Sequence, residues 1–171
     1  MNGKLGSGSL SIMNRISHHG FEVVPAPADA GPAMQALIVA VLKEYGLTPD
    51  QAGVDADVLD IERHYRQPGG EFFAVYREGE LVGTMGVVPV SADSCELRKM
   101  YLHPSVRGAG LGKRLLALAE AEARQRGYSQ MQLETASVLK EAIALYERHG
   151  YVAQCGSPHV GRCDRIYRKQ L

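Results

Sequence analysis

The sequence predicts a mixed α/β (α+β) domain, in which a central, mostly antiparallel twisted sheet of six or seven strands is flanked by about four helices. Three features of the chain support this prediction. Apolar segments form a meander over residues 72–103, a glycine-rich loop opens a long amphipathic pattern at 107–127, and a strand, a helix and two more strands follow from residue 129. The strand–helix–strand unit in the middle predicts a right-handed parallel crossover.

Size and charge narrow the class of protein. The chain has 171 residues, which corresponds to about one domain. Basic and acidic residues balance at 19 each, so the net charge predicts neither nucleic acid nor an anionic membrane as a partner. The three cysteines are too few for a disulfide framework, which fits a reduced, cytoplasmic setting. Cys155, His159 and Cys163 match no zinc-ligand spacing, so we expect no metal site.

The first residues differ in composition from the rest. Residues 1–20 are rich in Gly and Ser and lack the continuous apolar segment of a signal peptide. The longest apolar run, residues 36–42, is far shorter than the ~20 residues that span a bilayer. We therefore expect residues 1–20 to form a flexible tail, a candidate remnant of recombinant expression, and residues 21–171 to form a single domain without a membrane anchor.

Elements of the first half follow from apolar spacing. Residues 21–25 predict a short strand. Asp29 is expected to cap a helix that has Pro32 in its first turn and ends at Gly46. A second, acidic helix is predicted over residues 55–65. Its acidic residues either favour a cationic acceptor or form a solvated face.

Elements of the second half alternate more regularly. The meander comprises strands at 72–76, 81–90 and 95–103, with a hairpin turn at Gly79. A helix follows at 110–126 and ends at Gly127. The remaining segments predict a strand at 129–135, a helix at 138–149, and strands at 151–155 and 163–171.

The glycine-rich loop "RGAGLGK" has the chemistry of a phosphate-binding loop. Backbone N–H groups at a helix start lack partners within the helix, and the helix dipole adds positive charge there. Glycine lets that backbone approach a phosphate closely. A P-loop is excluded because Arg107 stands at its first glycine and Arg114 at its Ser/Thr. A dinucleotide fingerprint fails because Lys113 occupies the third glycine.

A third pattern, [RQ]-x-x-G-x-[GA], is matched from Arg107. The stretch "LRKMYLHPSVRGAGLGKRLLALAEAEARQRGY" resembles the acetyl-CoA-binding core of the GNAT superfamily of N-acetyltransferases. The stretch "LETASVLKEAIALYERHGYV" is similar to the C-terminal strand and helix of the same superfamily. The resemblance is specific over residues 96–152 and looser elsewhere.

The resemblance implies acetyl-CoA as the cofactor and assigns residues to it. Residues 107–113 would wrap the pyrophosphate, and backbone groups of the preceding strand would hold the pantetheine arm. An Asn that touches the coenzyme in many members is replaced here by Leu139, and Ser137 is a candidate substitute. The implied cofactor-binding residues are Met100, Tyr101, Leu102, Arg107, Gly108, Ala109, Gly110, Leu111, Gly112, Lys113, Ser137 and Tyr146.

Acetyl transfer to an amine needs a base and an acid. An alkylammonium has a pKa near 10.4, so reaching the free amine at neutral pH costs about 4–5 kcal/mol. Glu96 resembles the catalytic Glu of several family members, whereas Glu134 is a rival base because it ends the next strand. Tyr146 matches the family tyrosine that protonates the leaving thiolate.

The resemblance predicts an enzyme that transfers acetyl from acetyl-CoA to a primary amine by direct attack in a ternary complex. The acceptor would be a small molecule or a peptide, and a homodimer occurs among relatives. Two other classes remain for testing. One is a non-catalytic CoA-binding sensor, and the other is a nucleotide-binding oxidoreductase, which the failed fingerprint disfavours.

Overall fold

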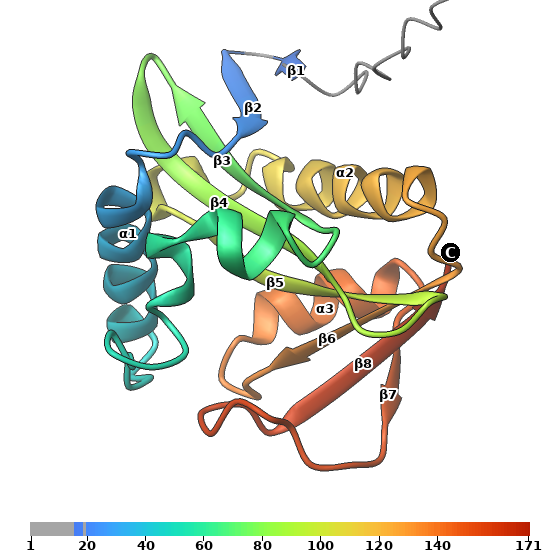
Figure 1. Ribbon diagram of the computed structural model, residues 1–171. Coiled ribbons are helices and arrows are strands. Elements are labelled where there is room, and N and C mark those ends of the chain that lie inside the picture. Colours follow the sequence, from blue (N-terminus) through green and yellow to red (C-terminus); the bar gives the residue numbers. More distant parts are fainter. Residues whose placement is uncertain (1–15, 19) are drawn as a thin grey trace, which may run out of the picture.

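The computed structural model describes residues 16–18 and 20–171 of the chain. These residues form one sheet with the strand order β1-β2-β3-β4-β5-β6-β8-β7 (Figure 1). The predicted mixed sheet with one parallel pair is confirmed. The strands are β1 (Ile16–His18), β2 (Phe21–Pro25), β3 (Glu71–Arg77), β4 (Glu80–Pro89), β5 (Ser94–Leu102), β6 (Gln130–Thr135), β7 (Val152–Gln154) and β8 (Arg165–Gln170).

The parallel pair β5/β6 determines where the sheet opens. Only the first residues of the two strands pair, from Ser94 opposite Gln130 to Leu97 opposite Leu133. Beyond Leu97 the two strands diverge, as their ribbons do from right to left in Figure 1. Every other neighbouring pair in the described sheet is antiparallel. The divergence leaves an opening in the middle of the sheet that side chains or a ligand must fill.

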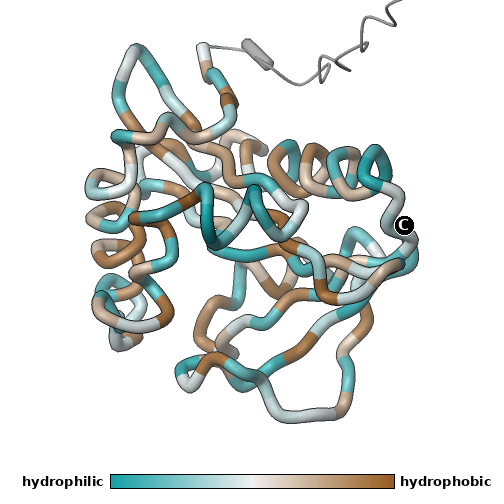
Figure 2. Tube along the Cα trace, viewed as in Figure 1, coloured by the Kyte–Doolittle hydropathy of each residue, from teal (hydrophilic) through white to brown (hydrophobic). Residues whose placement is uncertain are grey.

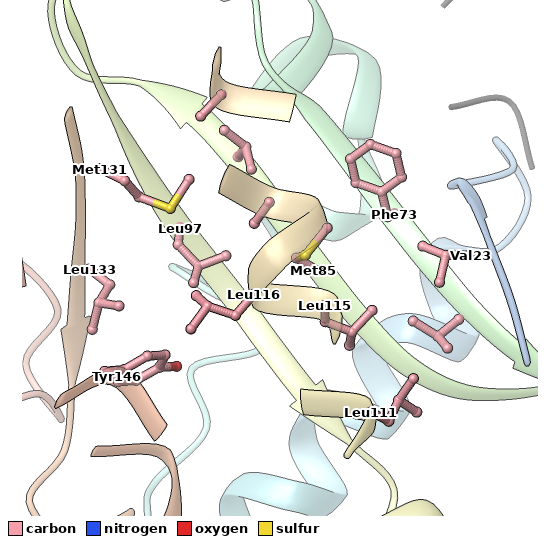
Figure 3. Packing of buried hydrophobic residues seen from close by; sticks show 14 of the residues in the cluster. Val23, Phe73, Met85, Leu97, Leu111, Leu115, Leu116, Met131, Leu133 and Tyr146 are labelled. Atoms are coloured by element: carbon pink, nitrogen blue, oxygen red, sulfur yellow. The ribbon is translucent and has the colours of Figure 1, made fainter. Parts of the chain in front are cut away.

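Helices cover the two faces of the sheet and divide its core. Helices α2 (Leu111–Gln125) and α3 (Lys140–Arg148) pack on one face, where Leu115, Leu116 and Tyr146 are buried among strand residues (Figure 3). Helix α1 (Gly31–Glu44) packs on the other face through a second buried cluster. Hydrophobic and hydrophilic positions alternate around α1 and α2 in Figure 2, as expected for helices with one buried face.

Two predictions for the N-terminal part are wrong. The N-cap of α1 is Ala30, without a side-chain hydrogen bond, rather than Asp29; Pro32 does lie in the first turn. Residues 16–18 form β1 instead of belonging to the tail. Without β1, strand β2 would be an unpaired sheet edge, and such edges readily accept another strand. Of the rest of the predicted tail, Gly20 lies in the turn before β2, and residues 1–15 and 19 lie outside the described residues.

The predicted acidic helix over residues 55–65 is two short segments. A 3₁₀ turn, η1 (Asp57–Leu59), precedes a π-helix, η2 (Glu62–Arg66). Asp60 separates them with φ −138° and ψ 73°, and its Oδ1 accepts a hydrogen bond from Arg63 N–H at 3.1 Å. A short acidic side chain that binds backbone N–H groups starts a new helical segment. None of the helices in the described residues is long and apolar enough to cross a bilayer.

Candidate active site

Strand β5 carries a bulge where it parts from β6. Gly86 pairs with Arg98 and Thr84 with Tyr101, so two β5 residues, Lys99 and Met100, stand opposite one residue of β4. Lys99 has a φ of 49°, which is unusual for a residue with a side chain. The hydroxyl of Thr84 donates to the Lys99 carbonyl at 2.8 Å and so replaces a bond that the bulge removes from the ladder. The bulge re-aims the backbone of residues 99–101 relative to β4.

The glycine loop joins β5 to α2 through a 3₁₀ turn, η3 (Pro104–Val106). Gly108 and Gly110 have φ values of 82° and 76°, and a Cβ on either would meet nothing within 4 Å. Gly110 is the N-cap of α2 and offers no side-chain cap, so the first N–H groups of the helix are left for other partners. Gly112 serves packing instead, because a Cβ there would lie 3.4 Å from Leu145 of α3.

Arg107 attaches this loop to α1. Its guanidinium donates to both carboxylate oxygens of Glu44, at 2.6 and 3.0 Å, and to the Tyr45 hydroxyl at 3.2 Å. It lies 5.4 Å from the centroid of the Tyr45 ring, and its Nε donates to the Leu102 carbonyl. The side chain of Arg107 therefore holds the loop in place, and the sequence pattern gave no sign of its partner Glu44.

A cavity of about 940 Å³ lies between the diverging ends of β5 and β6. Its size is at the upper end for small-molecule sites. The wall combines the glycine loop, the bulge of β5, the end of β6 and one face of α3. The predicted residues that line it are Met100, Tyr101, Leu102, Arg107, Gly108, Gly110, Leu111, Gly112, Lys113, Glu134 and Tyr146.

Three predicted residues do not line this cavity. Ala109 lies in the loop between two lining glycines. The N–H and the hydroxyl of Ser137 donate to the two carboxylate oxygens of Asp164, both at 2.7 Å. Both donors of Ser137 are therefore bound to Asp164 and not directed to the cavity. Glu96 lies on the opposite side of β5 from Leu97, which is packed against α2, because strand residues alternate between faces.

Tyr146 reaches the cavity from α3. It is 6% exposed and packs 5.8 Å from the ring of Tyr151 and 6.5 Å from that of Tyr167, measured between centroids. In Figure 3 it lies beside Leu133 at the edge of the cluster, with its hydroxyl oxygen directed away from β6. Burial, followed by the nearby Tyr101 and Cys163, raises the pKa of Tyr146. The phenol therefore keeps its proton at neutral pH.

The two predicted carboxylates have different surroundings. The side chain of Glu96 is 10% exposed, and its Oε2 accepts from Nε and Nη2 of Arg98 at 3.0 and 2.8 Å. Glu134 accepts from the backbone N–H groups of His159 and Val160, and its Oε1 lies 2.7 Å from His159 Nδ1. Burial alone would raise the pKa of Glu134, but these bonds outweigh it and lower the pKa.

An ion cluster beside the bulge was not foreseen from the sequence. The fully buried carboxylate of Asp55 accepts from both Nη atoms of Arg162, at 2.9 and 2.8 Å, and from Lys99 Nζ at 3.0 Å. Asp57 lies 3.4 Å from the same Lys99 nitrogen and accepts from the Tyr65 hydroxyl. Two of the acidic residues at 55–65 are therefore neutralised inside the protein. They neither form a solvated face nor offer free charge to a cationic acceptor.

Comparison with known proteins assigns the chain to a family. The model of the Acetyltransferase (GNAT) family matches residues 38–151. The N-acetyltransferase YjgM of Escherichia coli is 44% identical over 125 residues, which cover 70% of this chain and 75% of that protein.

Solved structures share the fold. A GNAT-family acetyltransferase of Staphylococcus aureus superposes with a TM-score of 0.82 at 20% identity, covering 88% of this chain and 98% of that one. The PaiA N-acetyltransferase of Thermoplasma acidophilum, solved in complex with coenzyme A, has a TM-score of 0.74 at 15% identity, covering 88% and 99%. The glycine loop at the open start of α2, the divergence of β5 from β6 and these matches lead to one conclusion: the chain belongs to the GNAT family and is an N-acetyltransferase.

Proposed function

We propose that this protein transfers an acetyl group from acetyl-CoA to a primary amine, by direct attack of the amine in a ternary complex. The observation that carries the proposal is a cavity lined both by the glycine loop at the open N-terminus of α2 and by Tyr146 of α3. One end of this cavity offers unpartnered N–H groups to a phosphate, and the other offers an acid.

The residues of the cavity fit acetyl-CoA, which would supply the acyl thioester. The backbone at Gly108 and Gly110 is open to a pyrophosphate, because no atom would contact a Cβ there within 4 Å. The pantetheine arm would lie along Met100, Tyr101 and Leu102, whose backbone the bulge re-aims. The Thermoplasma acetyltransferase that shares the fold was solved with coenzyme A, which supports coenzyme A as the ligand of such a cavity.

Tyr146 is the proposed acid. Its hydroxyl carries a proton at neutral pH, as a phenol ordinarily does, and burial raises its pKa further. The proton is therefore present for transfer to the departing thiolate, whose developing negative charge would draw it. The same raised pKa means that Tyr146 would not remove a proton from the amine. The acid and the base are therefore different residues.

Glu96 is the better of the two candidate bases. Both oxygens of Glu134 are occupied by the loop at His159 and Val160, and its lowered pKa weakens it as a base. Glu96 has one oxygen, Oε2, bonded to Arg98 and lies on the sheet face opposite α2. We propose that Glu96 accepts the amine proton through water, with the acceptor approaching from that face.

The first experiment identifies the bound cofactor and tests turnover. Mass spectrometry of the natively purified protein should detect CoA or acetyl-CoA. Thiol release should then be followed with polyamines, amino acids, aminoglycosides and peptide N-termini, and we expect turnover with at least one of them. Bound NAD in place of CoA would overturn the proposal, and CoA binding without turnover on any amine would favour a sensor. The homodimer stays a prediction, which sedimentation would test.

A further inference from the structure

A buried ion cluster lies beside the proposed binding site without a role in the reaction as described so far. It comprises Asp55, Asp57, Lys99 and Arg162, which we call the Asp55 cluster. We propose that Asp55 is a positioning residue, which fixes the bulge of β5 and the loop between β7 and β8 in the places from which they line the cavity. This inference rests on the proposed function, because the bulge is where the pantetheine arm is proposed to bind.

The first connection runs from Asp55 to the bulge. Lys99 has an unfavourable φ of 49°, so the surrounding structure must hold it there. Its backbone carbonyl is held by Thr84. Its side chain, only 6% exposed, donates to the Val54 carbonyl at 2.9 Å and to Asp55 Oδ1 at 3.0 Å. Lys99 is therefore fixed at both its backbone and the tip of its side chain.

The second connection runs from Asp55 to the loop of residues 155–164. Arg162, whose side chain is 11% exposed, forms a two-point bond with the Asp55 carboxylate across 107 residues of sequence. The neighbouring Cys163 lines the cavity, as Arg162 does. A bidentate Arg–carboxylate pair fixes orientation as well as distance. The loop is thus attached near its C-terminal end by Asp55 and near its middle by Glu134, through His159.

Asp55 acts through these residues and not by touching the ligand. Lys99, Tyr101 and Arg162 line the cavity, whereas Asp55 is fully buried behind them and does not. The carboxylate is itself oriented by the Asp50 N–H at 2.9 Å. Removing its charge would leave two nearly buried cations with too little negative charge between them, and they would repel each other. The bulge and the loop would then both shift.

This arrangement predicts that loss of the Asp55 charge affects the two ends of acetyl-CoA unequally. The glycine loop has its own anchor, the Arg107–Glu44 pair. Among the described residues, the hydrogen-bond partners of the Asp55 carboxylate are Asp50, Lys99 and Arg162, and none of them belongs to this loop. That loss should therefore weaken binding of the pantetheine arm, whereas the phosphate-binding loop should keep its conformation. Adenosine 3′,5′-bisphosphate keeps the adenosine and the inner 5′-phosphate of coenzyme A but lacks the outer phosphate and the pantetheine arm. Its affinity therefore reports on the phosphate end of the site without the arm.

The experiment compares the two ligands in Asp55→Asn. We expect calorimetry to give a Kd for acetyl-CoA about tenfold higher than in the wild type, and a kcat lowered by at least as much. The Kd for adenosine 3′,5′-bisphosphate should change less than about twofold, since the Arg107–Glu44 pair is untouched. Equal weakening of both ligands, or no change in either, would overturn the inference.

Two further variants separate positioning from general destabilisation. Glu120→Gln removes another buried carboxylate, which binds Lys169 Nζ at 2.8 and 2.9 Å and does not line the cavity. It should leave both Kd values and kcat unchanged. Arg162→Lys keeps the charge but loses the two-point bond, and it should reproduce the split between the ligands more weakly. If Asp55→Asn does not fold, the milder Arg162→Lys variant tests the positioning role in its place.

A measurement without any ligand makes the outcome independent of the proposed function. Hydrogen exchange of the peptide that covers residues 96–106 should be faster in Asp55→Asn than in the wild type, and unchanged in Glu120→Gln. If the wild type binds no acetyl-CoA, the proposed function fails while faster exchange still supports the positioning role. Unchanged exchange in folded Asp55→Asn would overturn the positioning role even if the wild type is an active acetyltransferase.

Discussion

The glycine loop and the Asp55 cluster line or support the same cavity by different means. The loop spans seven consecutive positions, 107–113, of which all but Ala109 line the cavity, and Gly108 and Gly110 leave the surface open. The cluster depends on side chains that are 44 and 107 residues apart in sequence and meet only in the folded chain. A local backbone motif leaves a pattern in the sequence, whereas a set of long-range ion pairs leaves none.

The largest effect is expected at neither of these regions but at Tyr146, the proposed acid, which lines the cavity from α3. Tyr146→Phe should lower kcat by about 10²–10³-fold, because positioned acid catalysis is lost, with little change in the Kd for acetyl-CoA. Tyr151→Phe is the matched control, since its ring packs against Tyr146 but does not line the cavity. Steady-state kinetics with the acceptor that the screen identifies would measure both. Unchanged turnover in Tyr146→Phe would remove this residue from the mechanism.

The glycine loop should be sensitive to charge more than to shape. Gly110→Asp should weaken acetyl-CoA binding by about tenfold to hundredfold, since a carboxylate at the N-cap of α2 would repel the pyrophosphate. Gly127→Asp controls for strain, because Gly127 also has a positive φ (88°) and open space but lies at the other end of α2. Calorimetry measures both variants. Normal binding by folded Gly110→Asp would refute the assignment of the loop.

Glu134 should behave as an anchor of the loop and not as the base. Glu134→Gln exchanges an anion that accepts from His159 and Val160 for a weaker acceptor, so the free energy of unfolding should fall by about 1–2 kcal/mol. Its kcat should fall by less than about threefold, whereas Glu96→Gln should lower kcat far more. Urea denaturation measures the stability of the Glu134→Gln and Glu96→Gln variants, and steady-state kinetics measures their kcat. A large loss of kcat in Glu134→Gln with normal stability would make Glu134 the base.

The smallest expected effect is on the pH dependence of stability. The pKa values of Asp55 and Glu134 are lowered in the folded protein, Asp55 by Arg162 and Lys99 against the opposing effect of burial. Such groups stabilise the fold above their unfolded pKa, near 4, and lose that contribution as the pH falls through the folded value. The free energy of unfolding should therefore decline below about pH 4, and less steeply in Glu134→Gln. Urea titrations between pH 3 and pH 7 would show this.

Some features followed from the sequence alone because their causes are local. The order of strands and helices from residue 71 onward follows from apolar spacing and turn residues. The glycine loop and the "LYERHGY" segment were sufficient to predict the family, which the match over residues 38–151 confirms. Positions 108 and 110 need a residue that adopts a positive φ beside an open surface, and glycine does so. Because such requirements concern residues close together in the chain, they appear as a sequence pattern.

Only the tertiary structure decided how the walls of the cavity are held. No pattern in the sequence indicated that Glu44 would bind Arg107, that Asp55 would join Lys99 to Arg162, or that Glu134 would bind the loop at His159. It also suggested one acidic helix where Asp60 divides the segment in two. These pairings depend on which charges the sheet brings together in a water-poor interior, where an unpaired charge is costly. Their partners are set by three-dimensional packing, and sequence spacing carries no record of it.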